Sequence, residues 1–114
     1  MANPLQGEVY RWPDVPDKHP MSTKVRMWVV VSRDVFNKHF GYVLACPLTS
    51  YPPTQIDIPV RSTPHNPLTH DSALLARMVT PIGNDELGQP LGRLPFPTIA
   101  EVAQRLHQII ETGE

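Results

Sequence analysis

The sequence predicts a single, mainly β domain spanning residues 1–114. Short strands form a strongly curved antiparallel sheet or small barrel, and one helix packs at the C-terminal end. Three observations support this fold class. A chain of 114 residues suits one hydrophobic core and is too short for two. Its 14 prolines are spread along the chain, which favours short strands joined by stiff loops. The connections between the expected strands are too short for parallel crossovers.

The first expected strand covers residues 7–12 (GEVYRW), where apolar and polar side chains alternate until Pro13 ends the pattern. Residues 13–24 (PDVPDKHPMSTK) then predict a loop that contains three prolines. A connection of about a dozen residues without a pattern of its own is typical of a functional or mobile segment. We therefore expect this loop to be functional or mobile.

Two buried strands are expected next. Residues 27–31 (MWVVV) are continuously apolar and β-branched, which is typical of a strand covered on both faces. Residues 32–41 (SRDVFNKHFG) predict a helical turn or tight loop that ends at the glycine. Residues 42–48 (YVLACPL) predict the following strand, which delivers Thr49 and Ser50 at its end.

The second half of the chain predicts two further strands. Residues 55–60 (QIDIPV) alternate between apolar and other side chains, and the proline among them indicates an edge strand. Residues 72–79 (SALLARMV) predict another buried strand, and residues 80–90 (TPIGNDELGQP) predict the loop in which it ends.

The last segment predicts one amphipathic helix. Thr98 and Glu101 have the spacing of a capping box, and Gly113 suits the end of the helix. The apolar stripe of this helix has helical spacing and consists of Ile99, Val102, Ala103, Leu106, Ile109 and Ile110.

Charge and cysteine content bound the class of protein. A net charge of −1 gives no global attraction to nucleic acid or to an anionic membrane. Residues 1–46 hold six lysines and arginines against four acids, which leaves a local basic patch open. The single Cys46 has no partner for an internal disulfide, and its apolar setting predicts burial. Without a signal peptide or an apolar run near roughly 18 residues, the protein is expected to be cytoplasmic.

The sequence lacks the motifs of most enzyme classes. It contains no phosphate-binding glycine loop, HExxH, CxxC or GxSxG, and its acids do not have the spacing of a two-metal site. We therefore expect neither a metal nor a cofactor. Of the five histidines, His19 is the best acid–base candidate because it lies in the loop before Arg26. The other four are interpreted as solvated surface residues.

Arg26 and Thr49 are the best candidates for a reaction that needs no metal. An arginine at the mouth of a strand donates two hydrogen bonds to a phosphate and stabilises the charge that builds on its oxygens. A nearby threonine hydroxyl holds the same phosphate, as an attack by an RNA 2′-hydroxyl requires. Polar residues are also common at the ends of ordinary buried strands, so these two residues alone leave both interpretations open.

The order of segments resembles the MazF/PemK (Kid) family of toxin endoribonucleases. That family has a G-[DE]-[IV] start, an arginine before an apolar strand, an S-x-D-x-x-N element and a strand that ends in P-L-T-S. The matching residues here are Gly7, Glu8, Val9, Arg26, Val29–Ser32, Asp34, Asn37, Gly41 and Pro47–Ser50. The segments LLARMVT and LGRL, followed by the final helix, extend the resemblance over nearly the whole chain.

The resemblance implies an SH3-like barrel of the CcdB/MazF/Kid type that forms a homodimer and binds a cognate antitoxin. It also implies metal-independent, sequence-specific cleavage of single-stranded RNA to 2′,3′-cyclic phosphate and 5′-hydroxyl ends. The catalytic arginine and threonine of the family match Arg26 and Thr49. The residues expected to bind RNA are Ser50, Lys24, Lys18, His19, Trp12 and Arg77, with Trp12 the aromatic side chain most suited to meet a base.

Two departures from the family pattern keep other functions open. Met27 stands where the family usually has proline, and Arg77-Met78-Val79 replaces its Gln-x-Arg. One alternative is therefore a non-catalytic binding module of the same fold. A second is the sister branch directed at DNA gyrase, which the sequence disfavours because the chain ends in QIIETGE without the terminal tryptophan of that branch.

Overall fold

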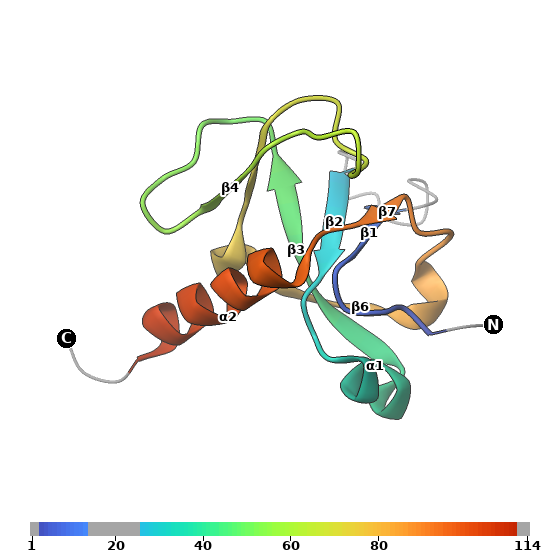
Figure 1. Ribbon diagram of the computed structural model, residues 1–114. Coiled ribbons are helices and arrows are strands. Elements are labelled where there is room, and N and C mark those ends of the chain that lie inside the picture. Colours follow the sequence, from blue (N-terminus) through green and yellow to red (C-terminus); the bar gives the residue numbers. More distant parts are fainter. Residues whose placement is uncertain (1–2, 14–25, 112–114) are drawn as a thin grey trace.

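A computed structural model describes residues 3–13 and 26–111 (Figure 1). The strands are β1 (Glu8–Trp12), β2 (Arg26–Val30), β3 (Tyr42–Thr49), β4 (Ile58–Val60), β5 (Ser72–Leu74), β6 (Thr80–Gly83) and β7 (Gly92–Arg93). The α-helices are α1 (Asp34–Phe40) and α2 (Phe96–Ile110), and the 3₁₀ turns are η2 (Ala76–Met78) and η3 (Asn84–Glu86). None of the helices in the described ranges is long and apolar enough to cross a membrane.

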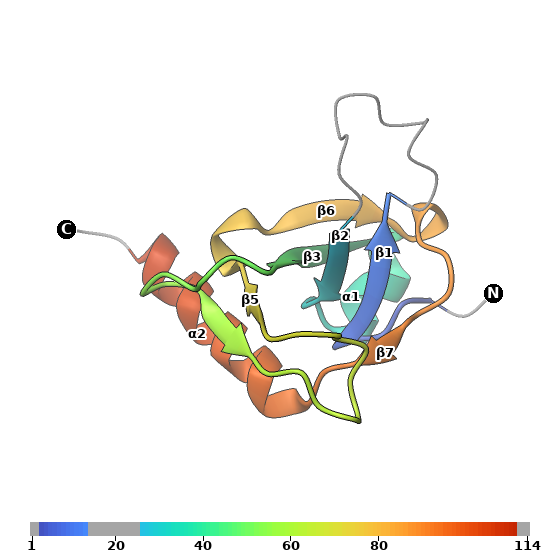
Figure 2. The same cartoon turned by 90° about the horizontal axis from the view of Figure 1, so that it is seen from above.

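The seven strands form one curled sheet in the order β4-β5-β3-β2-β1-β7, with β6 pairing β3. Each strand pair in this sheet is antiparallel, as expected from the short connections. Figure 2 shows the strands curling into an open half-barrel, with α2 packed along one side. The predicted mainly β fold with a C-terminal helix is therefore confirmed.

The long strand β3 connects the two halves of the sheet. On one edge it pairs with β2, where Val29 lies opposite Cys46. On its other edge it pairs first with β6, up to Ala45, and then with β5, where Leu48 lies opposite Leu74. The strand is therefore held by three neighbours, and its C-terminal end is shared between the two parts of the sheet.

The sheet is covered on both faces by separate apolar clusters, and alternate residues of β2 point into each. Val29 belongs to the first cluster, which α2 covers, whereas Trp28 and Val30 belong to the second. This arrangement confirms the prediction of a doubly covered strand. Cys46 is fully buried in the first cluster, so its predicted burial is confirmed, and burial raises the pKa of its thiol to about 12.

The S-x-D-x-x-N element anchors the N-terminal segment to α1. Asn37 is fully buried; its Nδ2 donates to the carbonyls of Pro4 (3.0 Å) and Ser32 (3.2 Å), and its Oδ1 accepts a hydrogen bond from the Ser32 hydroxyl. Asp34 Oδ1 accepts a hydrogen bond from the backbone N–H of Gln6 (2.7 Å). Gly41 ends α1 with a φ of 74°, a conformation that favours glycine. This element thus has a structural role in the fold.

The prediction for residues 72–90 is partly wrong. The expected strand stops at Leu74 and continues as the turn η2, while part of the expected loop forms the strand β6. β6 tolerates Pro81 because this residue lies opposite Leu44, whose backbone groups point to the other edge of β3. There, the Leu44 carbonyl accepts the N–H of Val31 (2.9 Å), so no ladder hydrogen bond requires an N–H at Pro81.

The predicted start of the final helix is also wrong. The helix α2 begins at Phe96, and Pro97 occupies its first turn, where a proline without an N–H is well tolerated. Thr98 therefore lies inside the helix and donates its backbone N–H to the carbonyl of Pro95 (3.1 Å) instead of capping it. Of the predicted apolar stripe, Ile99 and Val102 are buried, Leu106 packs at the edge of the first cluster, and Ala103, Ile109 and Ile110 are exposed. Gly113 lies outside the described residues.

Candidate functional site

Arg26 and Thr49 lie at the same end of two paired strands. The pairing of β2 with β3 ends where Trp28 lies opposite Pro47, and Arg26 and Thr49 each lie two residues beyond this pair, toward the same end of the sheet. Both strand ends lie at the upper edge of the sheet in Figure 1. Because side chains alternate between the two faces along a strand, Arg26 lies on the face of Trp28 and Thr49 on the face of Pro47, which is the same face of the sheet.

Trp12 extends this row onto the neighbouring strand. It lies opposite Arg26 in the pairing of β1 with β2. Its ring packs edge-on against the ring of Trp28, with centroids 5.4 Å apart, and its backbone carbonyl accepts a hydrogen bond from Trp28 Nε1 (3.2 Å). Trp28 is only 9% exposed, as expected for a residue of the doubly covered strand. The contact of Trp12 with an RNA base stays a prediction.

Arg26 is partly exposed, and within residues 3–13 and 26–111 no carboxylate forms an ion pair with its guanidinium group. Thr49 is also partly exposed, and its Oγ1 accepts a hydrogen bond from the backbone N–H of Tyr51 (3.3 Å). This bond leaves the threonine O–H as a donor. The row therefore presents a fork of cationic donors beside a hydroxyl donor, which is suited to a phosphate group.

Ser50, predicted to bind RNA, is exposed directly after Thr49 and lines a surface pocket of about 310 Å³ together with Tyr51. Three other predicted RNA-binding residues, Lys18, His19 and Lys24, lie outside the described residues. In the described part of the chain, no group of three histidine, cysteine or acidic side chains has a geometry that could hold a metal ion.

Arg77, predicted to bind RNA, does not belong to this row. β5 runs antiparallel to β3 with Ala73 opposite Thr49, so Arg77 lies further along the chain, away from the Thr49 end of β3. The Nε of Arg77 donates to Asp57 Oδ1 (3.2 Å), and its side chain is 42% exposed. One donor of Arg77 is therefore used in a structural ion pair.

Sequence analysis missed the role of Asp57. It was expected on the exposed face of an alternating strand, yet Asp57 is 3% exposed while Ile56 is 42% exposed. Asp57 Oδ2 accepts hydrogen bonds from the N–H (3.0 Å) and the hydroxyl (2.8 Å) of Thr54. The alternation failed because these bonds and Arg77 satisfy a buried carboxylate, and no local sequence signal reveals a partner 20 residues away.

The stability of the protein is expected to fall on acidification through Asp57. Burial alone would raise the pKa of this carboxyl group, but hydrogen bonds from Thr54 and the charge of Arg77 outweigh it and lower the pKa below its ordinary value of 3.8. The unfolded state therefore binds a proton first, and the stabilisation present at neutral pH is lost as the pH falls below about 4.

Urea denaturation at pH 7 and pH 3 tests this linkage. Asp57→Asn is expected to be less stable than the parent at pH 7 and to lose less stability between the two pH values. Asp85→Asn, at an exposed position, is the control and should follow the parent. Equal losses for the parent and Asp57→Asn would contradict the assignment.

Comparison with known proteins identifies the family. The family model described as PemK-like, MazF-like toxin of type II toxin-antitoxin system matches residues 5–110. The chain belongs to this family. Among the curated proteins, endoribonuclease MazF1 of Mycobacterium bovis and endoribonuclease MazF4 of Mycobacterium tuberculosis are each 32% identical over 104 residues, covering 90% of this chain and 88% of the relative.

Solved structures of MazF-like toxins share the whole fold. An endoribonuclease in complex with its cognate antitoxin, from a mycobacterial species, is 28% identical with a TM-score of 0.72, covering 100% of this chain and 99% of that chain. MazF of Deinococcus radiodurans is 20% identical with a TM-score of 0.75, covering 96% and 98%, and this likeness concerns the fold alone. The MazF-like chain described here is thus the toxin of a toxin–antitoxin system, and the gyrase-directed and non-catalytic alternatives are not favoured.

Proposed function

We propose that this MazF-like toxin is a metal-independent, sequence-specific endoribonuclease for single-stranded RNA, with Arg26 and Thr49 as its catalytic residues. The observation that supports the proposal is that Arg26 and Thr49 lie just beyond the last pair of β2 and β3, at the same end and on the same face of the sheet. The names of the mycobacterial relatives as endoribonucleases support the same activity.

In the proposed reaction, the RNA 2′-hydroxyl attacks the adjacent phosphorus and the bond to the 5′ oxygen breaks. The 2′-hydroxyl loses one proton and the departing 5′ oxygen gains one, so the products are a 2′,3′-cyclic phosphate and a 5′-hydroxyl. The guanidinium of Arg26 stabilises the negative charge on the phosphate oxygens, and the hydroxyl of Thr49 donates to one of them.

Other side chains are proposed to hold the RNA strand. Trp12 lies in the same row as Arg26 and offers a ring for stacking, and Ser50 follows Thr49 at an exposed position. Arg77 is proposed to use its terminal amino groups for RNA, because among the described residues its contact with Asp57 is made through Nε. Lys18, His19 and Lys24, in the segment outside the described residues, complete the proposed RNA-binding set.

We further propose that the toxin forms a homodimer, acts in the cytoplasm on cellular RNA and is neutralised by a cognate antitoxin. The mycobacterial structure with 28% identity is an endoribonuclease in complex with its cognate antitoxin, which supports the last point. Exposed apolar side chains on the single chain, including Phe40 (55%) and Ile110 (72%), support association with a second chain.

Incubation of a long single-stranded RNA with the purified protein in excess EDTA tests the proposed reaction. We expect cuts at a short recurring sequence, with 5′-hydroxyl and 2′,3′-cyclic phosphate ends. An intact RNA in the presence of folded protein would overturn the proposal, and fragments with 5′-phosphate ends would show a different chemistry.

A further inference from the structure

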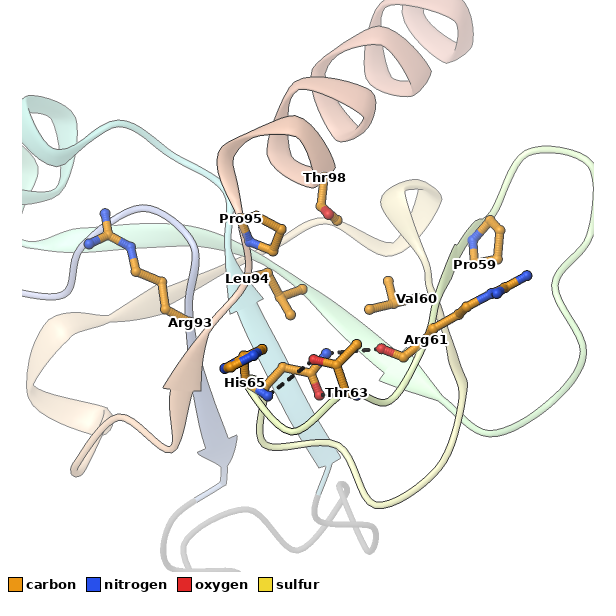
Figure 3. A pocket seen from close by; sticks show the side chains of 10 residues that line it. Pro59, Val60, Arg61, Thr63, His65, Arg93, Leu94, Pro95 and Thr98 are labelled. Carbon is orange, nitrogen blue, oxygen red and sulfur yellow. Dashed lines mark hydrogen bonds between the residues drawn. The ribbon is translucent and has the colours of Figure 1, made fainter.

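A pocket of about 560 Å³ lies between β4, the loop of residues 61–66 and the start of α2 (Figure 3). Its apolar wall consists of Val60, Leu94 and Pro95, of which Val60 and Leu94 are buried below the surface. The dimensions and the apolar wall suit a planar ring with polar edges better than an isolated ion.

The loop that borders this pocket is held in shape by its own hydrogen bonds. Asn66 Nδ2 donates to the carbonyl of Arg61 (2.9 Å), and Asn66 Oδ1 accepts the N–H of Leu68 (3.1 Å). Thr63 Oγ1 accepts the N–H of His65 (3.2 Å). The pocket is therefore preformed, and a ligand does not need to order this loop.

Two arginines, Arg61 and Arg93, and one histidine, His65, line the pocket. No aspartate or glutamate is among its lining residues. Figure 3 shows Arg61 and Arg93 on opposite sides of the pocket, each with its guanidinium pointing outward. Arg93 Nε donates to the carbonyl of Gln6 (3.2 Å), whereas the guanidinium of Arg61 and the ring of His65 have no hydrogen-bond or ion-pair partner in the described part of the chain. The Arg61 side is thus open to an anion.

A smaller pocket that starts next to Thr49 adjoins this pocket and shares residues of its wall. The pocket of about 310 Å³ that begins at Ser50 and Tyr51, next to Thr49, also contains Arg61 and shares two β4 residues with the larger pocket. Tyr51, which lines the smaller pocket, is 69% exposed. The acid on its wall, Asp71, has its Oδ1 bound to the N–H of Ser62 (2.8 Å), which reduces its repulsion of a phosphate.

We propose that the larger pocket is a subsite for a flanking nucleotide of the single-stranded RNA, outside the cleaved linkage. The base packs on the wall of Val60 and Leu94 beside the ring of His65, and Arg61 binds the phosphate that connects it to the cleaved region. This inference rests on the proposed function, because it continues the RNA strand from Thr49 over Tyr51. RNA is favoured over an acidic peptide because the site combines an apolar wall for a ring with a cation for the linking phosphate.

Binding of RNA that cannot be cleaved tests the subsite directly. The probes are fluorescein-labelled 2′-O-methyl oligouridines of four and twelve nucleotides, which lack the attacking hydroxyl, and the readout is fluorescence anisotropy. The parent protein is expected to bind the longer probe more tightly. Arg61→Ala and His65→Ala are each expected to reduce this gain roughly tenfold, the size of one lost stacking or phosphate contact.

Matched controls separate the subsite from general electrostatics. Arg33→Ala removes the same charge beside α1, and His107→Ala removes an exposed histidine from α2; both should keep the full gain with length. For Arg61→Ala, the slope of log K against log salt is also expected to fall by about 0.7, the value for one phosphate contact on a single strand.

Each outcome decides the inference. The inference would be overturned if the tighter binding of the longer probe were unchanged in Arg61→Ala and His65→Ala, or were reduced equally in the control variants. Loss of affinity for a cognate antitoxin peptide in these variants, with RNA binding unchanged, would assign the pocket to the protein partner instead. If the protein cleaves RNA but both variants still bind the longer probe more tightly, the proposed subsite is wrong and the proposed reaction stands. If the protein cleaves no RNA but the two variants lose the tighter binding of the longer probe, the proposed reaction is wrong and the pocket remains an RNA-binding site.

Discussion

Arg26→Ala is expected to lower the rate of RNA cleavage by roughly 10²- to 10³-fold, the usual effect of removing one donor to a developing oxyanion. The reason is that the described residues contain no second arginine in the row formed by Trp12, Arg26 and Thr49. Arg26→Lys should recover only part of the rate, because lysine keeps the charge but loses the fork of donors. Initial rates on a long RNA in EDTA measure the effect.

Thr49 gives a second, independent readout of the same site. Thr49→Ala should slow cleavage, and Thr49→Ser should restore it because serine returns the hydroxyl donor. Arg33→Ala, at the opposite end of β2, is the control for charge and should keep the parental rate. Thermal unfolding must show that each variant is folded. A folded Arg26→Ala that cleaves within twofold of the parent would remove Arg26 from the mechanism.

Asn37→Ala is expected to lower the free energy of unfolding by about 3 kcal/mol, since each buried polar group left without a partner costs about 1–3 kcal/mol. Asn37 is fully buried, and its amide satisfies the carbonyls of Pro4 and Ser32 as well as the Ser32 hydroxyl. Its removal leaves these groups without their partner and leaves a cavity beneath α1. Urea denaturation at neutral pH measures the loss.

The neighbouring substitution Lys38→Ala is the matched control, because Lys38 is exposed on the same helix and its change should fall within about 0.5 kcal/mol. The Asn37 network lies at the end of β2 opposite Arg26, so cleavage per folded molecule should be unaffected in Asn37→Ala. A stability loss below about 1 kcal/mol would show that water or a rearranged α1 replaces the lost contacts.

Much of the first half of the fold is predictable from the sequence, because its strands bury continuous or alternating apolar residues. The segment MWVVV shows its double burial directly, since both sets of alternate side chains are apolar. Arg26 and Thr49 were chosen as the catalytic candidates through the family resemblance, and the strands end so that both lie at the same end of the sheet. Their catalytic roles stay predictions.

The second half is less predictable because its elements depend on partners far along the chain. Pro81 suggests a loop until the orientation of the Leu44 backbone is known. Asp57 suggests an exposed position until Thr54 and Arg77 are placed around it. The subsite pocket likewise combines β4 with the residues that precede α2, and no local pattern in the sequence connects these two segments.

In the proposed mechanism, strand pairing around β3 holds the catalytic residues, whereas the connecting segments are left to bind RNA. Thr49 lies at the end of a strand that pairs with three neighbours, and Arg26 pairs with Trp12 of β1, so strand pairing holds the proposed catalytic pair. The segments 50–57 and 61–71 connect β3 to β4 and β4 to β5, and neither takes part in the pairing of β2 with β3. Over evolution, these segments can change in sequence and length while the cut stays in place, so related toxins can acquire new RNA targets without rebuilding the catalytic pair.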